Sequence, residues 1–269
     1  MQGTSRASLN HVLRHVDTVL DSTDPEALAT ELFNVVQLLD AEHSLRRMLA
    51  DTSSEADQRT GVVGQLLESR VSPTTILVVN EVVRASWSRP RDLADAMERL
   101  AVNALAASVE STGDLGELED ELFRFERLVQ SQPELRDALT RPGVAAHRRR
   151  ALVEELLEAK VSSAALRLII QTVVAPRGRK LEKSLELYGS WVAERAQRRV
   201  AVVRTAVPLS DEQQQRLQRL LSEAYGRTVH MNIEVEPDVV GGMSIRIGDD
   251  VIDGSIAGKI AALRRRLAM

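Results

Sequence analysis

The chain has 269 residues, of which 43% are hydrophobic and 28% charged, and its formal net charge is −4. A chain of this length and composition can bury a hydrophobic core, which argues against a disordered protein. It contains no cysteine, which excludes disulfides, thiolate metal sites and a cysteine nucleophile, and its acidic and basic residues are nearly balanced along the sequence, which argues against a nucleic-acid-binding protein.

Helices are predicted for the first two hundred residues. The low content of aromatic residues and glycine favours helices that pack through Leu, Val and Ala. After a first helix over 5–20, Asp24 and Pro25 have the pattern of an N-cap followed by proline at the first helical position. The next helix begins there, and shorter helices are predicted near 44–49, 56–68 and 73–83. The stretch 92–111 lacks Gly and Pro and predicts one helix of about five turns.

A duplication organises this helical region. Residues 31–83 match residues 121–173 at a constant offset of 90 without a gap, so that ELFNVVQLLDAEHSLRRML lies over ELFRFERLVQSQPELRDAL. Apolar stripes that align by chance would not keep this register over so long a segment, so the match predicts a repeated helical module. The second copy is expected to begin with a capping box formed by Asp114 and Glu117.

The helix over 92–111 stands at the end of the first copy and at the start of the second. We therefore expect this helix to be shared, so that the two modules form a continuous stack and not beads on a flexible linker. The predicted domains are a first helical module over 1–105, a second over 106–199 and a C-terminal domain over 200–269.

From Val200 onward the hydrophobic pattern changes to alternation, which indicates strands. The first two strands are expected to be parallel around a helix that Ser210 and Gln213 cap, and the third to be antiparallel. Asp253 to Ser255 is interpreted as a turn before a terminal helix. The fold class is therefore mainly α with a small C-terminal α/β domain, which has a three-stranded sheet and two helices.

No pattern of a catalytic, cofactor or metal site is found. The sequence lacks a phosphate-binding loop, a dinucleotide-binding glycine motif and a nucleophile elbow, and the pair His11 and His15 has no third ligand on its helix face. The basic triplets Arg148 to Arg150 and Arg264 to Arg266 border helices and are interpreted as solvated faces or favourable contacts with the helix dipole. These observations predict a binding or structural protein with no catalytic residue, cofactor or metal.

The segment VHMNIEVEPDVVGGMSIRIGDDVIDGSIAGKIAALRRRL combines an apolar alternation, a glycine pair and the sequence DGSI. It resembles the C-terminal signature of the delta subunits of F-type ATP synthases, the bacterial relatives of the mitochondrial oligomycin-sensitivity-conferring protein. GDLGELEDELFRFERLVQSQPELRDAL also resembles the family's helical bundle, so the likeness covers about Leu100 to Met269. The signature residues are Glu236, Val239, Gly241, Gly242, Ile245, Arg246, Gly248, Asp253, Gly254 and Ser255.

The resemblance departs from the common family pattern in length, because this chain has two helical modules before the tail where most members have one. It is similar in this respect to the longer delta subunits of high-GC Gram-positive bacteria. Gly241 and Gly242 are expected to form a turn that needs positive φ.

The resemblance implies a non-catalytic stator subunit of a proton-translocating ATP synthase, which holds the catalytic head to the peripheral stalk so that rotor torque drives ATP synthesis. The implied partners are the N-terminal helices of the alpha subunits and the C-terminal ends of the stalk b subunits. One copy per complex is expected, on the cytoplasmic face of the bacterial cell membrane, without cofactor, nucleic acid or membrane insertion. An α-solenoid adaptor unrelated to ATP synthase remains the alternative, and a DNA-binding regulator is disfavoured by the charge balance.

In relatives the helical bundle accepts an amphipathic alpha-subunit helix between its first and fifth helices, which is recognition of a helix in a groove. The candidate groove in the second module comprises Leu100, Ala104, Ala107, Leu166, Ile169, Ile170 and Val173. The equivalent candidates in the first module are Leu9, Leu13, Val16, Ile76, Val79 and Val83. The candidates for stalk binding in the C-terminal domain are Ile252, Ile256, Ile260 and Leu263. For each of these residues, packing inside its own domain is the alternative.

Overall fold

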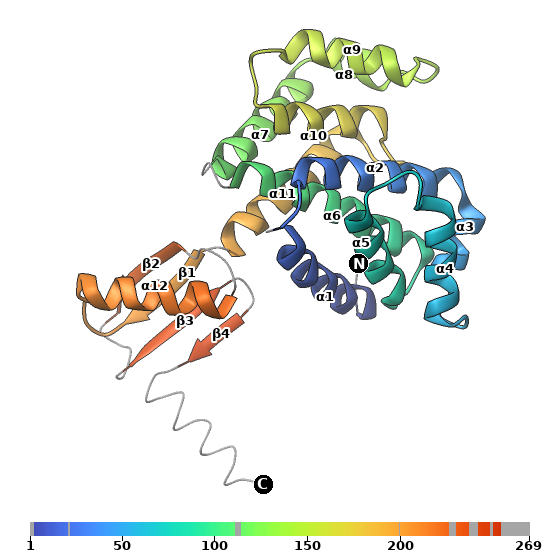
Figure 1. The fold of residues 1–269 in the computed structure, drawn as a ribbon. Coiled ribbons are helices and arrows are strands. Elements are labelled where there is room, and N and C mark those ends of the chain that lie inside the picture. The colour runs from blue at the N-terminus through green and yellow to red at the C-terminus, as the bar shows by residue number, and fades with distance from the viewer. Residues whose placement is uncertain are drawn as a thin grey trace. The chain divides into compact units, whose positions relative to one another are not determined.

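The structure is a computed structural model, and it describes residues 3–20, 22–110, 114–198, 200–225, 230–236, 242–247 and 250–253. The chain divides into two compact units, Met1–Ala193 and Glu194–Met269 (Figure 1). The first unit is helical and the second contains a small sheet, so the predicted fold class is confirmed. Among the described residues, no helix has both the length and the hydropathy needed to cross a membrane.

The helices of the first unit follow the predicted order. Proline at the start of a helix occupies a position whose N–H has no partner within the helix, and Pro25, Pro73 and Pro133 each stand there. The first six helices are α1 (Thr4–Leu20), α2 (Pro25–Ala41), α3 (His43–Ala50), α4 (Ala56–Leu67), α5 (Pro73–Arg84) and α6 (Pro90–Glu110). The next five are α7 (Leu115–Ser131), α8 (Pro133–Thr140), α9 (Ala146–Leu157), α10 (Ser163–Val174) and α11 (Leu181–Arg198).

The helix bounds repeat with the same offset of 90 residues as the sequence. Helices α2 to α5, which we call the first repeat, begin and end 90 positions before α7 to α10, the second repeat. Two capping serines repeat as well, because the Ser72 side chain accepts a hydrogen bond from the Thr75 N–H and the Ser162 side chain accepts one from the Ala165 N–H. The duplication therefore extends to individual helix ends.

Helix α6 is largely buried, and its residues from Leu100 to Ala106 are all buried. It contacts α1, α2, α3 and α5 on the side of the first repeat, and α7 and α10 on the side of the second. These contacts are the ones that a helix shared between two modules needs. The module boundaries at 105/106 and 199/200 stay predictions.

Two of the three predicted helix caps are confirmed and one is wrong. Asp24 accepts hydrogen bonds from the backbone N–H groups of Glu26 and Ala27, as predicted. The predicted capping box at the start of α7 is wrong, because the Asp114 side chain makes no capping hydrogen bond. The capping box before α12 (Asp211–Tyr225) is confirmed in both directions, with 3.3 Å from Gln213 N to Ser210 Oγ and 2.9 Å from Ser210 N to Gln213 Oε1.

The second unit contains the strands β1 (Val200–Thr205), β2 (His230–Val235), β3 (Met243–Ile247) and β4 (Asp250–Asp253), in the spatial order β2-β1-β3-β4. Strands β1 and β2 are parallel, as predicted, and β3 runs antiparallel to β1. The three predicted strands are present, and β4 extends the sheet to four strands by pairing antiparallel with β3. A strand of four residues is too short to show the alternation from which the others are predicted.

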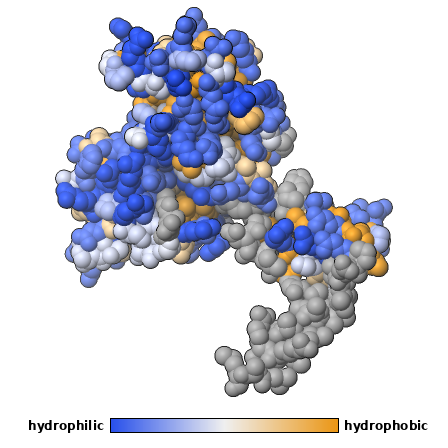
Figure 2. Space-filling model, turned by 180° about the vertical axis from the view of Figure 1, so that it is seen from behind, coloured by the Kyte–Doolittle hydropathy of each residue, from blue (hydrophilic) through white to orange (hydrophobic). Residues whose placement is uncertain are grey.

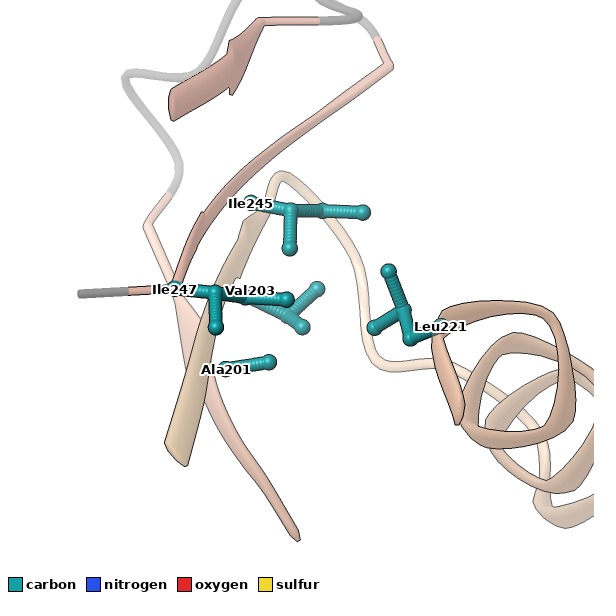
Figure 3. Close-up of a cluster of buried hydrophobic side chains, with 5 residues drawn as sticks. All are labelled: Ala201, Val203, Leu221, Ile245 and Ile247. Atoms are coloured by element: carbon teal, nitrogen blue, oxygen red, sulfur yellow. The ribbon is translucent and has the colours of Figure 1, made fainter. Parts of the chain in front are cut away.

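The core of this unit lies between the sheet and α12. Leu221 points from α12 toward Ala201 and Val203 of β1 and Ile245 and Ile247 of β3 (Figure 3). These are alternate residues of the two strands, as the period of two in a half-buried sheet requires. The predicted terminal helix lies outside the described residues.

Candidate partner-binding surfaces and the ion cluster between the repeats

The candidate groove of the second repeat lies where α6 and α10 contact each other. Leu100, Ala104, Ile169, Ile170 and Val173 are buried inside the chain itself. Ala107 and Leu166 are only partly buried. A partner helix on this surface would therefore contact Ala107 and Leu166. The other five residues are packed in the interior of the chain and are not accessible to it.

The equivalent surface of the first repeat has the same character. Helices α1 and α5 contact each other, and Leu9, Leu13, Val16, Val79 and Val83 are buried, whereas Ile76 is partly exposed. Ile76 and Leu166 stand at equivalent positions, 90 residues apart. The duplication thus provides a matched pair of accessible side chains.

One polar contact is conserved between the repeats and joins the first helix of each to its last. Glu31 accepts hydrogen bonds from the N–H and the hydroxyl of Ser72, at 2.9 and 2.7 Å. Glu121 accepts the same two bonds from Ser162, at 2.7 and 2.6 Å. These carboxylates satisfy backbone donors at the N-termini of α5 and α10, where an acidic group is also favoured by the helix dipole.

Glu31 accepts a third hydrogen bond, from the Thr75 hydroxyl at 2.5 Å. Burial alone would raise the pKa of Glu31, but the hydrogen bonds from Thr75 and Ser72 outweigh it and lower the pKa below its ordinary value. The charged carboxylate is therefore the form that the folded chain stabilises.

A second repeated contact uses arginine. The guanidinium of Arg59 donates to the carbonyl oxygen of Val83 at 2.5 Å, and that of Arg149 donates to the carbonyl oxygen of Val173 at 2.7 Å. Both carbonyl groups stand in the last turn of a helix, where the helix itself offers no donor. Each repeat therefore ties its third helix to the end of its fourth.

A buried ion cluster joins the first repeat to the loop that follows the second. We use the name ion cluster for Asp40, Asp95, Glu98, Arg177, Arg179 and Tyr188. Glu98 of α6 is 0% exposed and pairs with the guanidinium groups of both Arg177 and Arg179. Arg177 also reaches Asp40 of α2, with 2.6 Å from its Nε to Oδ2, and Asp95 of α6, with 3.0 Å from its Nη2 to Oδ1.

The phenol of Tyr188 in α11 completes the cluster by donating to Glu98 Oε1 at 2.8 Å. Burial, and after it the charge of Glu98, raises the pKa of Tyr188 far above its ordinary value, so this phenol stays protonated and remains a donor. Burial would lower the pKa of Arg177, but the charge of Glu98 and the bond to Asp40 raise it. Burial raises the pKa of Asp95 although the charge of Arg177 opposes this, and the carboxylates of the cluster are paired with arginines as buried ions require.

The ion cluster was not predicted from the sequence. Its members come from α2, α6, the loop after α10 and α11, so no periodic pattern connects them. Arg177 also has a φ of +53°, a left-handed conformation that a residue other than glycine rarely adopts. Neither feature has a signal in a single sequence.

The repeats differ in the surroundings of one aromatic residue. The ring of Phe33 in α2 stacks on that of Tyr188, with 6.5 Å between ring centroids, and Tyr188 in turn stacks on Trp191 at 5.6 Å. Phe33 is 7% exposed, whereas Phe123, its counterpart in α7, is 58% exposed. Helix α11 therefore covers the first repeat at a position that stays open in the second.

The accessible apolar residues of the C-terminal unit include one predicted candidate. Ile252 of β4 is 48% exposed, and Leu220 of α12 and Val235 of β2 are also exposed. In the face shown in Figure 2, apolar residues of the described part of this unit lie between polar ones. Ile256, Ile260 and Leu263 lie outside the described residues.

The described signature residues are Glu236, Gly242, Ile245, Arg246 and Asp253. Glu236 donates its N–H to the carbonyl oxygen of Thr205 at 2.9 Å, and its carboxylate lies 3.3 Å from Arg204 Nε. Gly242 has a φ of +86°, which confirms the expected backbone role at this position. Ile245 is part of the core, Arg246 is exposed and Asp253 ends β4. Val239, Gly241, Gly248, Gly254 and Ser255 lie outside the described residues.

Comparisons with known proteins give a consistent result. The model of a protein family described as "ATP synthase delta (OSCP) subunit" matches residues 97–267. A protein of Thermobifida fusca named "ATP synthase subunit delta" is 56% identical over 268 residues and is covered, like this chain, over 100% of its length. Proteins of the same name from Streptomyces avermitilis and Streptomyces griseus are 44% and 42% identical, with 98% and 100% of their lengths covered.

The region before residue 97 is part of this likeness to relatives, because they match along their whole length. The additional N-terminal helices are therefore shared with proteins of the same size. A chain of the solved "Cryo-EM structure of Toxoplasma gondii mitochondrial ATP synthase hexamer, composite model" aligns with 62% of this chain and 95% of its own, at 17% identity and a TM-score of 0.35. That score is too low to support a structural conclusion.

Proposed function

The chain belongs to the ATP synthase delta (OSCP) subunit family, whose members are components of the peripheral stalk, and from this membership we propose that it is a non-catalytic stator subunit. Its task is to hold the catalytic head to the peripheral stalk, so that torque from the rotor is used for ATP synthesis and does not turn the head. The complex would be proton-translocating and the subunit peripheral to it, on the cytoplasmic face of the cell membrane.

The observation that carries this proposal is the full-length identity of 56% with a protein named ATP synthase subunit delta. An identity of this extent over both helical repeats and the small sheet makes the unrelated α-solenoid adaptor the weaker alternative. A stator needs slow dissociation and stiffness. The buried ion cluster supports the second requirement, because it ties α2, α6 and α11 through charge-assisted hydrogen bonds.

For the head, we propose that the surface between the first and fifth helices of a module receives an amphipathic N-terminal helix of an alpha subunit. Leu166 and Ala107 would contact it in the second module, and Ile76 in the first. The modules follow the predicted division into 1–105 and 106–199. Two linked sites would gain affinity through effective concentration if both were occupied.

For the stalk, we propose that the C-terminal unit binds the ends of the b subunits through exposed apolar residues, with Ile252 as the described candidate. Replacement of Ile252 by Asp is expected to reduce recovery of b subunits with the tagged full-length chain. Asp at Val207, which is exposed in the loop before α12, serves as a control of equal charge. Equal recovery with both variants would contradict the assignment of Ile252.

The test of the whole proposal is co-purification. A tagged full-length chain recovered from detergent-solubilised membranes should carry the alpha and b subunits of the ATP synthase, identified by mass spectrometry. Membranes that lack the chain should keep ATP hydrolysis by the detached head and lose proton-driven synthesis. Recovery without any ATP synthase subunit, or synthesis at the normal rate without the chain, would overturn the proposal.

A further inference from the structure

A pocket with a volume of about 600 Å³ lies between the two repeats and has an excess of basic side chains. Arg46 and His43 come from α3, Arg150 and His147 from α9, and Arg91 from α6. Asp40 is the one carboxylate among the described residues that line it. The head-binding surfaces and the C-terminal unit do not contribute to this pocket.

The single acidic residue of the lining is already engaged. Asp40 is paired with Arg177 of the ion cluster and with Arg46, whose Nη1 lies 3.2 Å from Asp40 Oδ1. In the described part of the chain, the buried Nε of Arg46 finds no hydrogen-bond partner. Arg150 lies 3.8 Å from Glu154 and Arg91 lies 4.0 Å from Asp95, and both side chains are about half exposed. The weak pair of Arg150 leaves its guanidinium able to turn toward a bound anion. Arg91 also donates its Nη2 to the carbonyl oxygen of Arg177 at 2.5 Å, so it offers an anion its other N–H groups.

The basic residues at the N-terminus of α9, beside the pocket, are unusual and also point to a bound anion. The sequence from His147 to Arg150 occupies the first turn of α9, whose N-cap Ala145 makes no side-chain hydrogen bond. Positive charge at a helix N-terminus opposes the helix dipole. Of the two interpretations of Arg148 to Arg150, the favourable dipole contact is therefore wrong, because the triplet stands at the start of the helix and not at its end. The solvated face agrees with the exposure of Arg148 and Arg150.

The first repeat provides an internal reference for this feature. In α4, the counterpart of α9, Asp57 and Thr60 occupy the positions of His147 and Arg150. There the first turn carries the acidic residue that the dipole favours. Packing of the repeat thus does not require basic residues at these positions, and their presence in α9 calls for a function of the pocket.

We propose that this pocket binds a small soluble anion that carries more than one phosphate group. Arginine guanidinium groups match phosphate oxygens with paired hydrogen bonds, and arginines that converge from three helices can contact adjacent phosphates. The described lining contains no Phe, Tyr or Trp, and the imidazoles of His43 and His147 are its only rings on which a nucleobase could stack. Because the arginines bind the phosphate groups and not a base, pyrophosphate and the triphosphate of ATP bind with similar affinity. This site is independent of the proposed stator function.

The test is calorimetric titration of the full-length chain with pyrophosphate at low ionic strength, and with ATP in a second series. Arg150→Gln is expected to weaken pyrophosphate binding about tenfold, the loss typical of one charge-assisted contact. Arg148→Gln is the matched control, because Arg148 is exposed on the same turn and lies outside the lining, and it should change the affinity less than twofold.

Thermal unfolding of both variants shows whether the fold is intact, which is expected because both side chains are accessible to solvent. Arg91→Gln is a second variant, from a different helix, and should weaken binding to a similar extent. Absence of pyrophosphate binding to the unmodified chain would overturn the proposal. It would also be overturned by equal losses in the Arg148 and Arg150 variants, or by ATP binding much more tightly than pyrophosphate.

Discussion

The two repeats contain the same internal bonds and have different neighbours. Glu31 and Glu121 hold the N-termini of equivalent helices, and Arg59 and Arg149 hold the ends of the same helices. Yet Phe33 is covered by Tyr188, while Phe123 is exposed. The hydrogen bonds within a repeat are thus the same in both copies. The burial of a side chain at the surface of a repeat depends instead on which other helices lie against that repeat.

The ion cluster also involves the two repeats differently, because it includes a helix of the first repeat but only the loop that follows the second. The ion cluster takes Asp40 from α2 of the first repeat and Arg177 from the loop after the second, so it depends on tertiary structure that neither repeat possesses alone. A further pair, between Arg167 of α10 and Glu26 of α2 at 3.1 Å, lies at the surface and contributes less.

Loss of the central carboxylate should have the largest effect. Glu98→Ala leaves the buried guanidinium of Arg177 and the partly buried one of Arg179 without their shared partner. It is expected to destabilise the chain by about 3–5 kcal/mol in urea unfolding followed by circular dichroism. Asp120→Ala removes one side of an exposed pair with Arg124 and should cost less than about 1 kcal/mol. Similar losses in both variants would mean that the cluster does not connect the repeats.

Truncation of the paired phenylalanines tests the difference in their surroundings. Phe33→Ala removes a buried ring and is expected to cost about 3 kcal/mol of unfolding free energy. Phe123→Ala should change it by about 0.5 kcal/mol or less, because that ring is mostly in solvent. A large loss at Phe123 would show that α7 is covered in solution.

Asp substitutions at Leu166 and Ile76 test which repeat, if either, binds the catalytic head. Leu166→Asp should weaken binding of an alpha-subunit N-terminal peptide about tenfold or more if the second module is the site, and Ile76→Asp if it is the first. Fluorescence anisotropy with labelled peptide measures both. Ile169 and Ile170 are unsuitable positions, because they are buried and a charge there would disturb folding. Unchanged affinity in both variants would contradict the groove.

The smallest expected effect concerns Glu31 and depends on pH. Because the folded-state pKa of Glu31 lies below its unfolded value, its charge contributes stability that is fully present above the unfolded pKa and is lost as the pH falls through the folded pKa. Glu31→Gln should therefore cost about 1–2 kcal/mol at pH 7 and almost nothing at strongly acidic pH. Urea unfolding of both proteins across this range measures the difference. A cost that does not vary with pH would show that the charge is irrelevant.

Much of the helical architecture could be predicted from the sequence, because apolar periodicity and the offset of 90 residues are local signals. The groove shows the limit of this reasoning. Helical spacing identifies Leu100 and Ile169 as facing residues, but it does not distinguish a face that packs inside the chain from one that meets a partner. The structure shows that these two are buried, and that Leu166 and Ala107 beside them are accessible.

Other features could not be predicted for different reasons. The ion cluster depends on residues as far apart as Asp40 and Arg177, and such a pairing leaves no pattern in one sequence. Asp114 has the right spacing for a capping box, but its backbone, with φ −90° and ψ 14°, is not in the extended conformation typical of an N-cap. The local sequence identifies the helices, but which polar groups contact each other depends on the tertiary structure.

The backbone conformation of Arg177 has an evolutionary consequence. A left-handed residue other than glycine costs about 1–2 kcal/mol, so glycine would relax the chain at this position. Glycine would also remove the guanidinium group that reaches Asp40, Asp95 and Glu98 together. The arginine and its acidic partners should therefore have been gained or lost together, and lineages that replaced those acids should have drifted to glycine or asparagine at this corner of the chain.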